Sequence, residues 1–239
     1  MRRPIVIAAA LLAVLVVGGA AGAYAYFFSG LRSSPKPLAA ASPSPAASAT
    51  ASASPSGIAG NWTVGSGSVV GYRVREQFIG REANEAVART SDVSGGLTVN
   101  QAASGLTAGN LNFSAQVATL KSVDTVAGYN VANRDRIVSG TLQVSRFPTA
   151  SFQAASVALP AELASQEATL NVPGKLTIHG VTHDATANVT VQVSGDTAQV
   201  NGTVKIDMTD FGIQPPQVGF TSVDSATTIE FQLALNRVR

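Results

Sequence analysis

The chain has 239 residues, no cysteine, 16 basic residues and 14 acidic residues. The lack of cysteine excludes disulfides, thiolate metal sites, iron–sulfur clusters and cysteine nucleophiles. No acidic residue precedes Glu76 and four basic residues precede Ile58, which leaves 12 basic and 14 acidic residues from Ile58 onward. A domain this close to neutrality lacks the positive surface that binds phosphate backbones, which argues against nucleic acid as a partner.

The N-terminus contains a short basic segment, residues 1–4, and then an uncharged apolar run over residues 5–28. A helix of this length crosses a hydrocarbon core of ~30 Å with some tilt. The basic flank favours a cytoplasmic N-terminus, so the run predicts a single transmembrane anchor with the remaining chain outside the cytoplasm. The alternative is a signal peptide cleaved at Ala23-Tyr24-Ala25, which would release the exported protein from the membrane.

A Ser-, Ala- and Pro-rich segment over residues 29–57 follows the apolar run. Between Ser33 and Gly57, Leu38 is the one large apolar side chain. Such a composition has no apolar face to bury, and its prolines remove backbone donors. The segment is therefore predicted to be a disordered linker that tethers a globular domain over residues 58–239.

In the globular part, apolar and polar residues alternate, most clearly over residues 110–120 and 168–236. Successive side chains of a strand point to opposite faces, so each segment has one apolar and one polar face. At least five such strands around one interior predict an antiparallel barrel or sandwich that is apolar inside. The candidate ligand-binding residues are those predicted to line this interior: Leu111, Phe113, Val117, Leu170, Val172, Leu176, Val189, Val191, Val204, Ile206, Phe231 and Leu233.

Two further features bear on the interior. Several inward positions hold small residues, which favours a hollow interior over one filled by side chains. One stretch, residues 122–143, interrupts the alternation, and residues 129–138 within it predict a helical connection across the side or mouth of the barrel. The small inward residues are Ala115, Gly174, Ala185, Ala187 and Gly202.

Motifs for catalysis or metal binding are weak in this chain. The two histidines, His179 and His183, precede Asp184, but the segment joins two predicted strands, so an exposed hairpin turn is favoured over a metal site. The glycines of residues 65–71 miss the dinucleotide spacing and precede a strand, which favours a turn. No G-x-S-x-G motif occurs. We therefore expect no catalytic residue, metal or cofactor.

Several short motifs occur in a defined order along the globular part. They are Leu120-Lys121-Ser122, Asn133-Arg134-Asp135, the segment 147–152, the segment 174–182 and the segment 210–213. This ordered set resembles the YceI-like family of lipid- and polyisoprenoid-binding proteins. The resemblance implies a mainly β fold, an eight-stranded antiparallel lipocalin-like barrel with a short helical excursion. It also implies a long apolar tunnel for prenyl or acyl chains and no established catalytic residues.

The chain departs from that family in the segment 80–86, where many relatives have a histidine, and in a longer loop over residues 159–167. Both departures could reshape the tunnel mouth, so the ligand is not carried over from the family. Arg134 has two interpretations. It either meets a lipid headgroup at the mouth, or it forms an ion pair that pins the helical excursion to the barrel, and the second is favoured.

These features predict a non-catalytic barrel that binds an elongated apolar lipid for storage or transport in the cell envelope. The lipid would be an isoprenoid quinone, a polyprenyl chain or an acyl chain, held by partition into the apolar interior. One alternative is a barrel filled by its own side chains that serves as an envelope scaffold or adhesion module. An enzyme that acts on an envelope lipid is the less favoured alternative.

Overall fold

The computed structural model describes residues 34–38, 57–80, 82–126, 128–219 and 221–238. The predicted anchor over residues 5–28 lies outside these ranges, as does most of the predicted linker. Among the helices that the structure describes, none combines the length and the apolar character needed to cross a bilayer.

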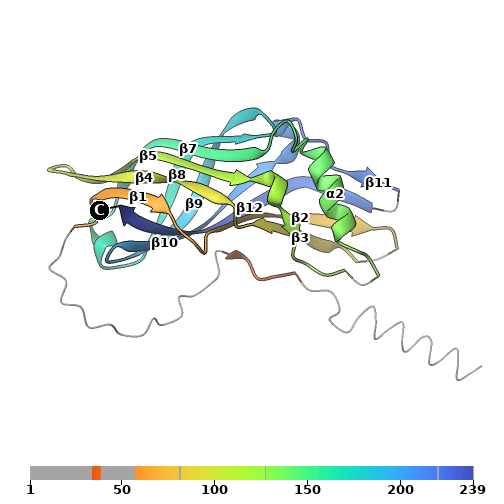
Figure 1. Cartoon of the computed structure of the whole chain (residues 1–239), viewed down its shortest axis with the longest axis horizontal. Coiled ribbons are helices and arrows are strands. Elements are labelled where there is room, and N and C mark those ends of the chain that lie inside the picture. The colour runs from red at the N-terminus through yellow and green to blue at the C-terminus, as the bar shows by residue number, and fades with distance from the viewer. Residues whose placement is uncertain (1–33, 39–56, 81, 127, 220, 239) are drawn as a thin grey trace, which may run out of the picture.

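The described residues form mostly β structure, as the alternation predicts. The only long helix among them, α2, comes between β6 and β7 (Figure 1). The elements are β1 (Gly60–Val64), β2 (Val69–Phe78), β3 (Asn84–Thr90), β4 (Val93–Ala102), β5 (Gly105–Gln116), η2 (Val117–Thr119), β6 (Lys121–Ser122), α2 (Ala132–Thr141), β7 (Thr149–Leu159), η3 (Ala161–Ala164), β8 (Ala168–Ile178), β9 (Val181–Ser194), β10 (Thr197–Asp207), η4 (Met208–Phe211), β11 (Gln217–Val218) and β12 (Thr221–Val238).

The sheet closes on itself because β1 pairs with both β4 and β12. β1 and β2 both pair antiparallel with β12 and are separated only by a short turn, so they act as one interrupted strand. β3 and β4 are related in the same way and pair with β2 and β1. With each of these two pairs counted as one strand, the described part of the chain is a closed, eight-stranded antiparallel barrel, as the resemblance implies.

The barrel is split at one end. There β3 pairs with the two-residue strand β6 instead of continuing alongside β5. Figure 1 shows α2 crossing this end, which also carries β11 and the β2–β3 hairpin, while the β4–β5 hairpin and the C-terminus lie at the other end. The predicted helical connection is thus confirmed, with α2 displaced toward the C-terminus from the predicted residues 129–138.

The hairpin between β8 and β9 is the turn that the sequence predicts at His179. Ile178 pairs with Val181, and the two residues between them, His179 and Gly180, have φ angles of 53° and 75°. Positive φ at both central residues is typical of the two-residue turns whose twist matches antiparallel strands. The turn ends two long strands and holds His179 at the edge of the barrel.

Candidate functional site

The interior of the barrel contains an elongated apolar cavity in two compartments. The first has a volume of about 180 Å³ and is lined almost entirely by aliphatic and aromatic side chains, most of them from β1, β2, β4, β5, β7, β8, β9, β10 and β12. The second has a volume of about 190 Å³ and lies beneath α2. Both linings include Val70, Ala115, Ala150 and Ile229, so the compartments adjoin at these four residues.

The predicted lining residues lie mostly where alternation places them. Leu111, Phe113, Leu170, Val172, Leu176, Val189, Val191, Phe231 and Leu233 line the first compartment. Val117 and Ile206 line the second. Val204 is also buried but belongs to the packed core and lines neither compartment. The structure therefore brings eleven of the twelve candidates to the cavity wall, and their contact with a ligand stays a prediction.

Two of the small inward residues do not leave hollow space. A Cβ added to Gly202 would lie 2.5 Å from Cζ of Phe231 and 2.6 Å from the backbone oxygen of Asn188. A Cβ added to Gly174 would similarly lie 2.5 Å from Cζ of Phe152. The expectation that these glycines favour a hollow interior is wrong, because neighbouring rings already occupy the space above them.

Ala115 and Ala187 do line the cavity. Of the five small residues predicted to face inward, these two widen the interior. Ala185 instead packs at the edge of the core, where it is partly buried.

A buried ionic cluster lies in the wall of the second compartment. Arg134 of α2 is 5% exposed, and its guanidinium lies 2.5 Å from Oε2 of Glu76 and 2.7 Å from Oδ1 of Asp124. The same Asp124 carboxylate accepts hydrogen bonds from Asn84 Nδ2 at 3.2 Å and from the Val87 backbone N–H at 3.1 Å. Arg134 therefore joins α2 to β2 and to the segment after β6, which is the pinning role favoured from the sequence.

The partners of Arg134 do not include the acidic residue beside it in the sequence. Its neighbour Asp135 does not pair with it but accepts a hydrogen bond from the backbone N–H of Ser122 at 2.9 Å. Glu76 was not predicted from the sequence to be a site residue, although Glu76 lies on the same inward face of β2 as Val74. A carboxylate on the inward, apolar face of a strand was the signal that could have revealed the cluster.

Two tyrosines also line the second compartment. Burial raises the pKa of Tyr72 far above its usual range, and the nearby carboxylates add to this effect. Burial followed by the charge of Glu76 also raises the pKa of Tyr129, whose ring lies 5.9 Å from the Arg134 guanidinium. Burial alone would lower the pKa of Arg134, but its bonds to Glu76 and Asp124 raise it. The compartment thus has two neutral hydroxyls beside one cation and two carboxylates.

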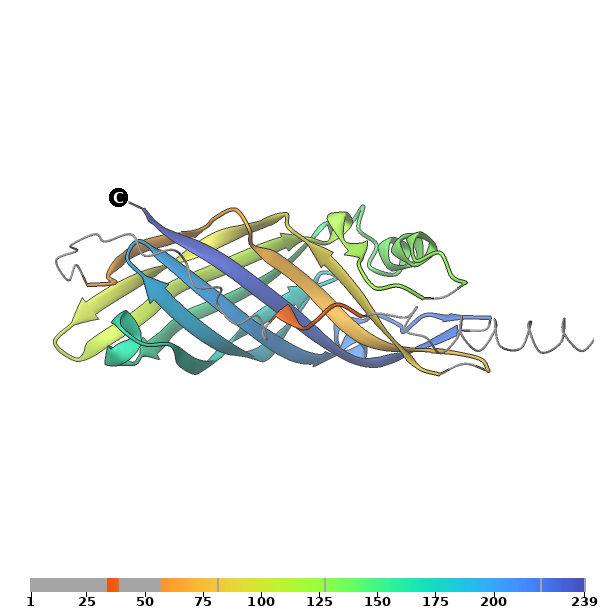
Figure 2. The same ribbon diagram turned by 90° about the horizontal axis from the view of Figure 1, so that it is seen from below.

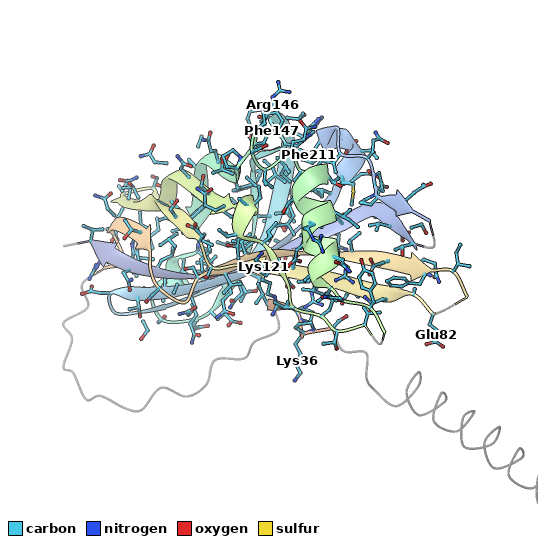
Figure 3. All side chains as sticks on the ribbon, turned by 45° about the vertical axis from the view of Figure 1, so that its right-hand side comes forward. Lys36, Glu82, Lys121, Arg146, Phe147 and Phe211 are labelled. Carbon is cyan, nitrogen blue, oxygen red and sulfur yellow. The ribbon has the colours of Figure 1, made fainter. Side chains whose placement is uncertain are left out.

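The histidines lie away from both compartments. Nδ1 of His179 is 3.3 Å from the backbone oxygen of Phe211, and its ring contacts Phe147 with 4.9 Å between the ring centroids. Figure 3 shows Phe147 and Phe211 together on the side of the barrel opposite Lys36. The predicted hairpin turn is present at His179, which is half-buried, whereas His183 is exposed but lies in β9, where it pairs with Leu176. The described part of the chain contains no group of three metal-ligating side chains.

The fold resembles that of a polyisoprenoid-binding domain from Saccharophagus degradans. The two share a TM-score of 0.54 and 14% sequence identity, over 74% of this chain and 98% of that domain. At this identity the likeness shows the fold alone.

Curated relatives match a shorter stretch. A UPF0312 protein of Pseudomonas putida strain W619 is 30% identical over 109 residues, and one of Pseudomonas syringae pv. tomato is 32% identical over 109 residues. The match covers 42% of this chain and spans about half, 54%, of the length of each relative. The model of the YceI-like domain matches residues 62–235, which is most of the chain and nearly the whole of the barrel. The chain belongs to the YceI-like family.

Proposed function

We propose that the barrel binds one elongated apolar lipid with its chain lying along both compartments. The observation that carries this proposal is the pair of adjoining apolar compartments inside a closed barrel. Each CH₂ moved from water into the cavity contributes ~0.8 kcal/mol, so a bound chain of several isoprene units is held strongly against release into water. The mechanism is partition with no covalent step. An apolar wall discriminates one methylene by only ~1–3 kcal/mol, so chain length is selected weakly.

The charges in the second compartment favour an uncharged headgroup there. Arg134 is already paired with both Glu76 and Asp124, so the cluster has a surplus of one negative charge. A carboxylate or phosphate headgroup would be repelled by this surplus in a poorly solvated site. The neutral hydroxyls of Tyr72 and Tyr129 can instead donate to a carbonyl oxygen. An isoprenoid quinone fits this environment better than a free fatty acid or a prenyl phosphate.

The proposal places the barrel in the cell envelope, for lipid storage or transport. It rests on the apolar run over residues 5–28, which is long enough to anchor the chain in a membrane with the barrel outside the cytoplasm. Intact-mass measurement of the protein extracted from membranes tests the anchor. Retention of residues 1–28 is expected, and a mature N-terminus near Tyr26 would mean that cleavage releases the barrel.

Mass spectrometry of lipids extracted from the purified protein tests the ligand. We expect one class of neutral, long-chain lipid at close to one molecule per barrel. Competition with a quinone and with a fatty acid of matched chain length then tests the headgroup. Stoichiometric recovery of an anionic lipid would overturn the neutral headgroup, and the absence of any lipid would overturn the binding function.

One observation favours a second candidate, the filled barrel that serves as a scaffold. The rings of Phe152 and Phe231 occupy the space above Gly174 and Gly202, so part of the interior is filled by the chain itself. The two candidates differ in lipid content. A scaffold would be isolated without lipid and would not take up an added quinone.

A further inference from the structure

Five residues of the predicted linker lie on the outer wall of the barrel. The segment Ser34–Leu38, called the strap below, crosses β12, β2 and β3 (Figure 2). Leu38 is only 9% exposed, although it was expected to belong to a flexible tether. Lys36 is exposed, and Figure 3 shows its side chain pointing away from the barrel. The strap therefore has one buried side and one side in water.

Polar contacts set the position of the strap along the wall. The backbone N–H of Leu38 donates to Oε2 of Glu230 at 3.2 Å, and Nη2 of Arg89 donates to the backbone oxygen of Lys36 at 2.7 Å. Nη2 of Arg73 donates to the backbone oxygen of Pro35. Near the other end, Oγ of Ser34 donates to the backbone oxygen of Glu85 at 2.8 Å. Because the partners of these bonds lie at fixed positions in the strands, the bonds specify one alignment of the strap along the barrel wall.

The residue beneath the strap, Glu230, explains why the strap binds there. Its neighbours Ile229 and Phe231 line the cavity, so the Glu230 carboxylate faces outward, yet it is fully buried. It lies 2.6 Å from Nε of Arg73 and 2.9 Å from Nη2 of Arg89. A carboxylate removed from water needs partners for its remaining lone pairs. The Leu38 N–H supplies one, and the strap covers the ion pairs that would otherwise face solvent.

The sequence of the strap differs from the rest of the linker at one decisive position. Residues 42–46 repeat its Ser-Pro-x-Pro pattern but end in Ala46 where the strap has Leu38. Proline favours extended backbone and lowers the entropy lost on docking, and both segments share that property. Only the strap has a large apolar side chain to bury, so the register on the barrel is specific to Ser34–Leu38.

The strap also has a direction. Ser34 lies beside Glu85, which pairs with Arg75 close to the β2–β3 hairpin, whereas Leu38 lies over Glu230, which pairs with Gly71 farther from it. The N-terminal end of the strap thus lies toward the hairpin. That end of the barrel carries α2 and the second compartment (Figure 1). It also carries Ile79, a large apolar residue that is 77% exposed.

We propose that the strap turns the α2 end of the barrel toward the membrane, so that the second compartment faces the bilayer that supplies the lipid. This inference rests on the membrane anchor of the proposed function. With the strap docked, only residues 29–33 separate the apolar run from the barrel, and five residues span at most ~18 Å. An undocked linker of 29 residues would have a mean reach of about 30 Å and would set no orientation.

The test uses the full chain in liposomes and exploits its lack of cysteine. A fluorophore is attached at Glu82→Cys, on the β2–β3 turn at the α2 end, or at Ser104→Cys, on the β4–β5 turn at the opposite end. Both residues are exposed. Quenching by a lipid-borne quencher reports how close each label lies to the bilayer. We expect severalfold stronger quenching at position 82 than at position 104.

Two strap variants show whether docking causes the difference. Leu38→Ala removes the buried side chain and is expected to equalise the quenching at the two labels. Lys36→Ala is the matched control, because it keeps the backbone oxygen that Arg89 binds, and the difference should persist. Equal quenching in the parent chain, or an unchanged difference in Leu38→Ala, would overturn the proposal. Failure of the protein to float with the liposomes would instead show that the anchor of the proposed function fails, and the orientation with it.

Discussion

Val191 and Gln192 are neighbours in β9 but face opposite sides of the barrel wall. Val191 lines the first compartment, and Gln192 is exposed. An aspartate at Val191 would place a charge among apolar groups with no partner, which is unfavourable by several kcal/mol or forces the carboxyl to stay neutral. Val191→Asp is therefore expected to abolish lipid retention, and Gln192→Asp to leave it unchanged. Mass spectrometry of bound lipid distinguishes the two, and equal lipid content would contradict the inward assignment.

Val204 offers a related test with a different expected readout. It packs in the core rather than against the cavity, while the adjacent Lys205 is exposed. Val204→Asp should mainly lower the free energy of unfolding, seen as a lower melting temperature or loss of folded protein. Lys205→Asp should melt close to the parent. A similar loss of stability in both variants would show that the inward and outward side chains of β10 are wrongly assigned.

Narrowing the cavity should separate binding from stability at Ala187. This residue lines the first compartment, so the ring in Ala187→Phe would occupy volume that the lipid needs. We expect less bound lipid with an unchanged or raised melting temperature. Gly202→Leu should behave differently, because the new side chain would clash with Phe231 and the Asn188 backbone. Such overpacking should lower the free energy of unfolding by about 1–3 kcal/mol. A loss of stability in Ala187→Phe with no lipid found would favour the filled scaffold.

Removing Arg134 should be more harmful than removing an exposed arginine. Arg134→Met leaves the carboxylates of Glu76 and Asp124 buried without their cation, and breaking such a buried pair costs about 3–5 kcal/mol. Arg136 in the same helix forms only an exposed hydrogen bond to Asn133, so Arg136→Met is the control. Urea denaturation compares the variants, and equal midpoints would show that the buried cluster does not hold α2 to the barrel.

At the scale of elements, α2 is tied to the barrel mainly through the ion pairs of Arg134. Arg134 is its one buried residue, while Ile137 and Val138 line the second compartment without being fully buried. Strand β10, in contrast, is hydrogen-bonded to β9 on one side and β12 on the other. An element with few buried contacts opens more often than the core of a sheet.

Amide hydrogen exchange tests this difference. We expect the amides of α2 to exchange faster than those of β10, and lipid loading to slow exchange in α2, because a lipid in the second compartment contacts its inner face. The β4–β5 hairpin, at the other end of the barrel, serves as an internal reference that lipid should affect less. If lipid slowed exchange only around that hairpin, the chain would lie in the first compartment alone.

At the scale of the whole molecule, all the strands that the structure describes lie within residues 60–238, so a truncated protein with residues 58–239 is expected to fold. The strap changes the expected stability, because its contacts exist only in the folded barrel. A protein with residues 30–239 should melt a few degrees higher, since ~1 kcal/mol corresponds to about 2–4 °C at this size. Far-UV circular dichroism should show β structure in both, and a helical or disordered spectrum of the shorter protein would contradict the domain boundary.

Alternation along the chain was sufficient to determine the β class, the inward side of β5, β8, β9, β10 and β12, and most of the cavity lining. It is a local property, because each strand residue points to the face opposite its neighbour whatever the rest of the fold does. Strand β4 was less evident, because Gly95 and Gly96 interrupt its pattern. The ring of Phe231 over Gly202 was also not predictable, since it depends on the register between β10 and β12.

Tertiary structure alone decided the contacts between distant segments. Glu76, Asp124 and Arg134 come from a strand, a loop and a helix, and no short-range pattern specifies their ion pairs. Likewise, nearly the whole domain separates Leu38 from Glu230 along the sequence, and the Ser-, Ala- and Pro-rich residues around Leu38 predict only a linker. Burial of a charge depends on which surfaces meet in the folded chain. The sequence by itself therefore determined antiparallel strands around an apolar interior, and the folded structure determined the closure of the barrel, its ionic cluster and the place where the linker binds it.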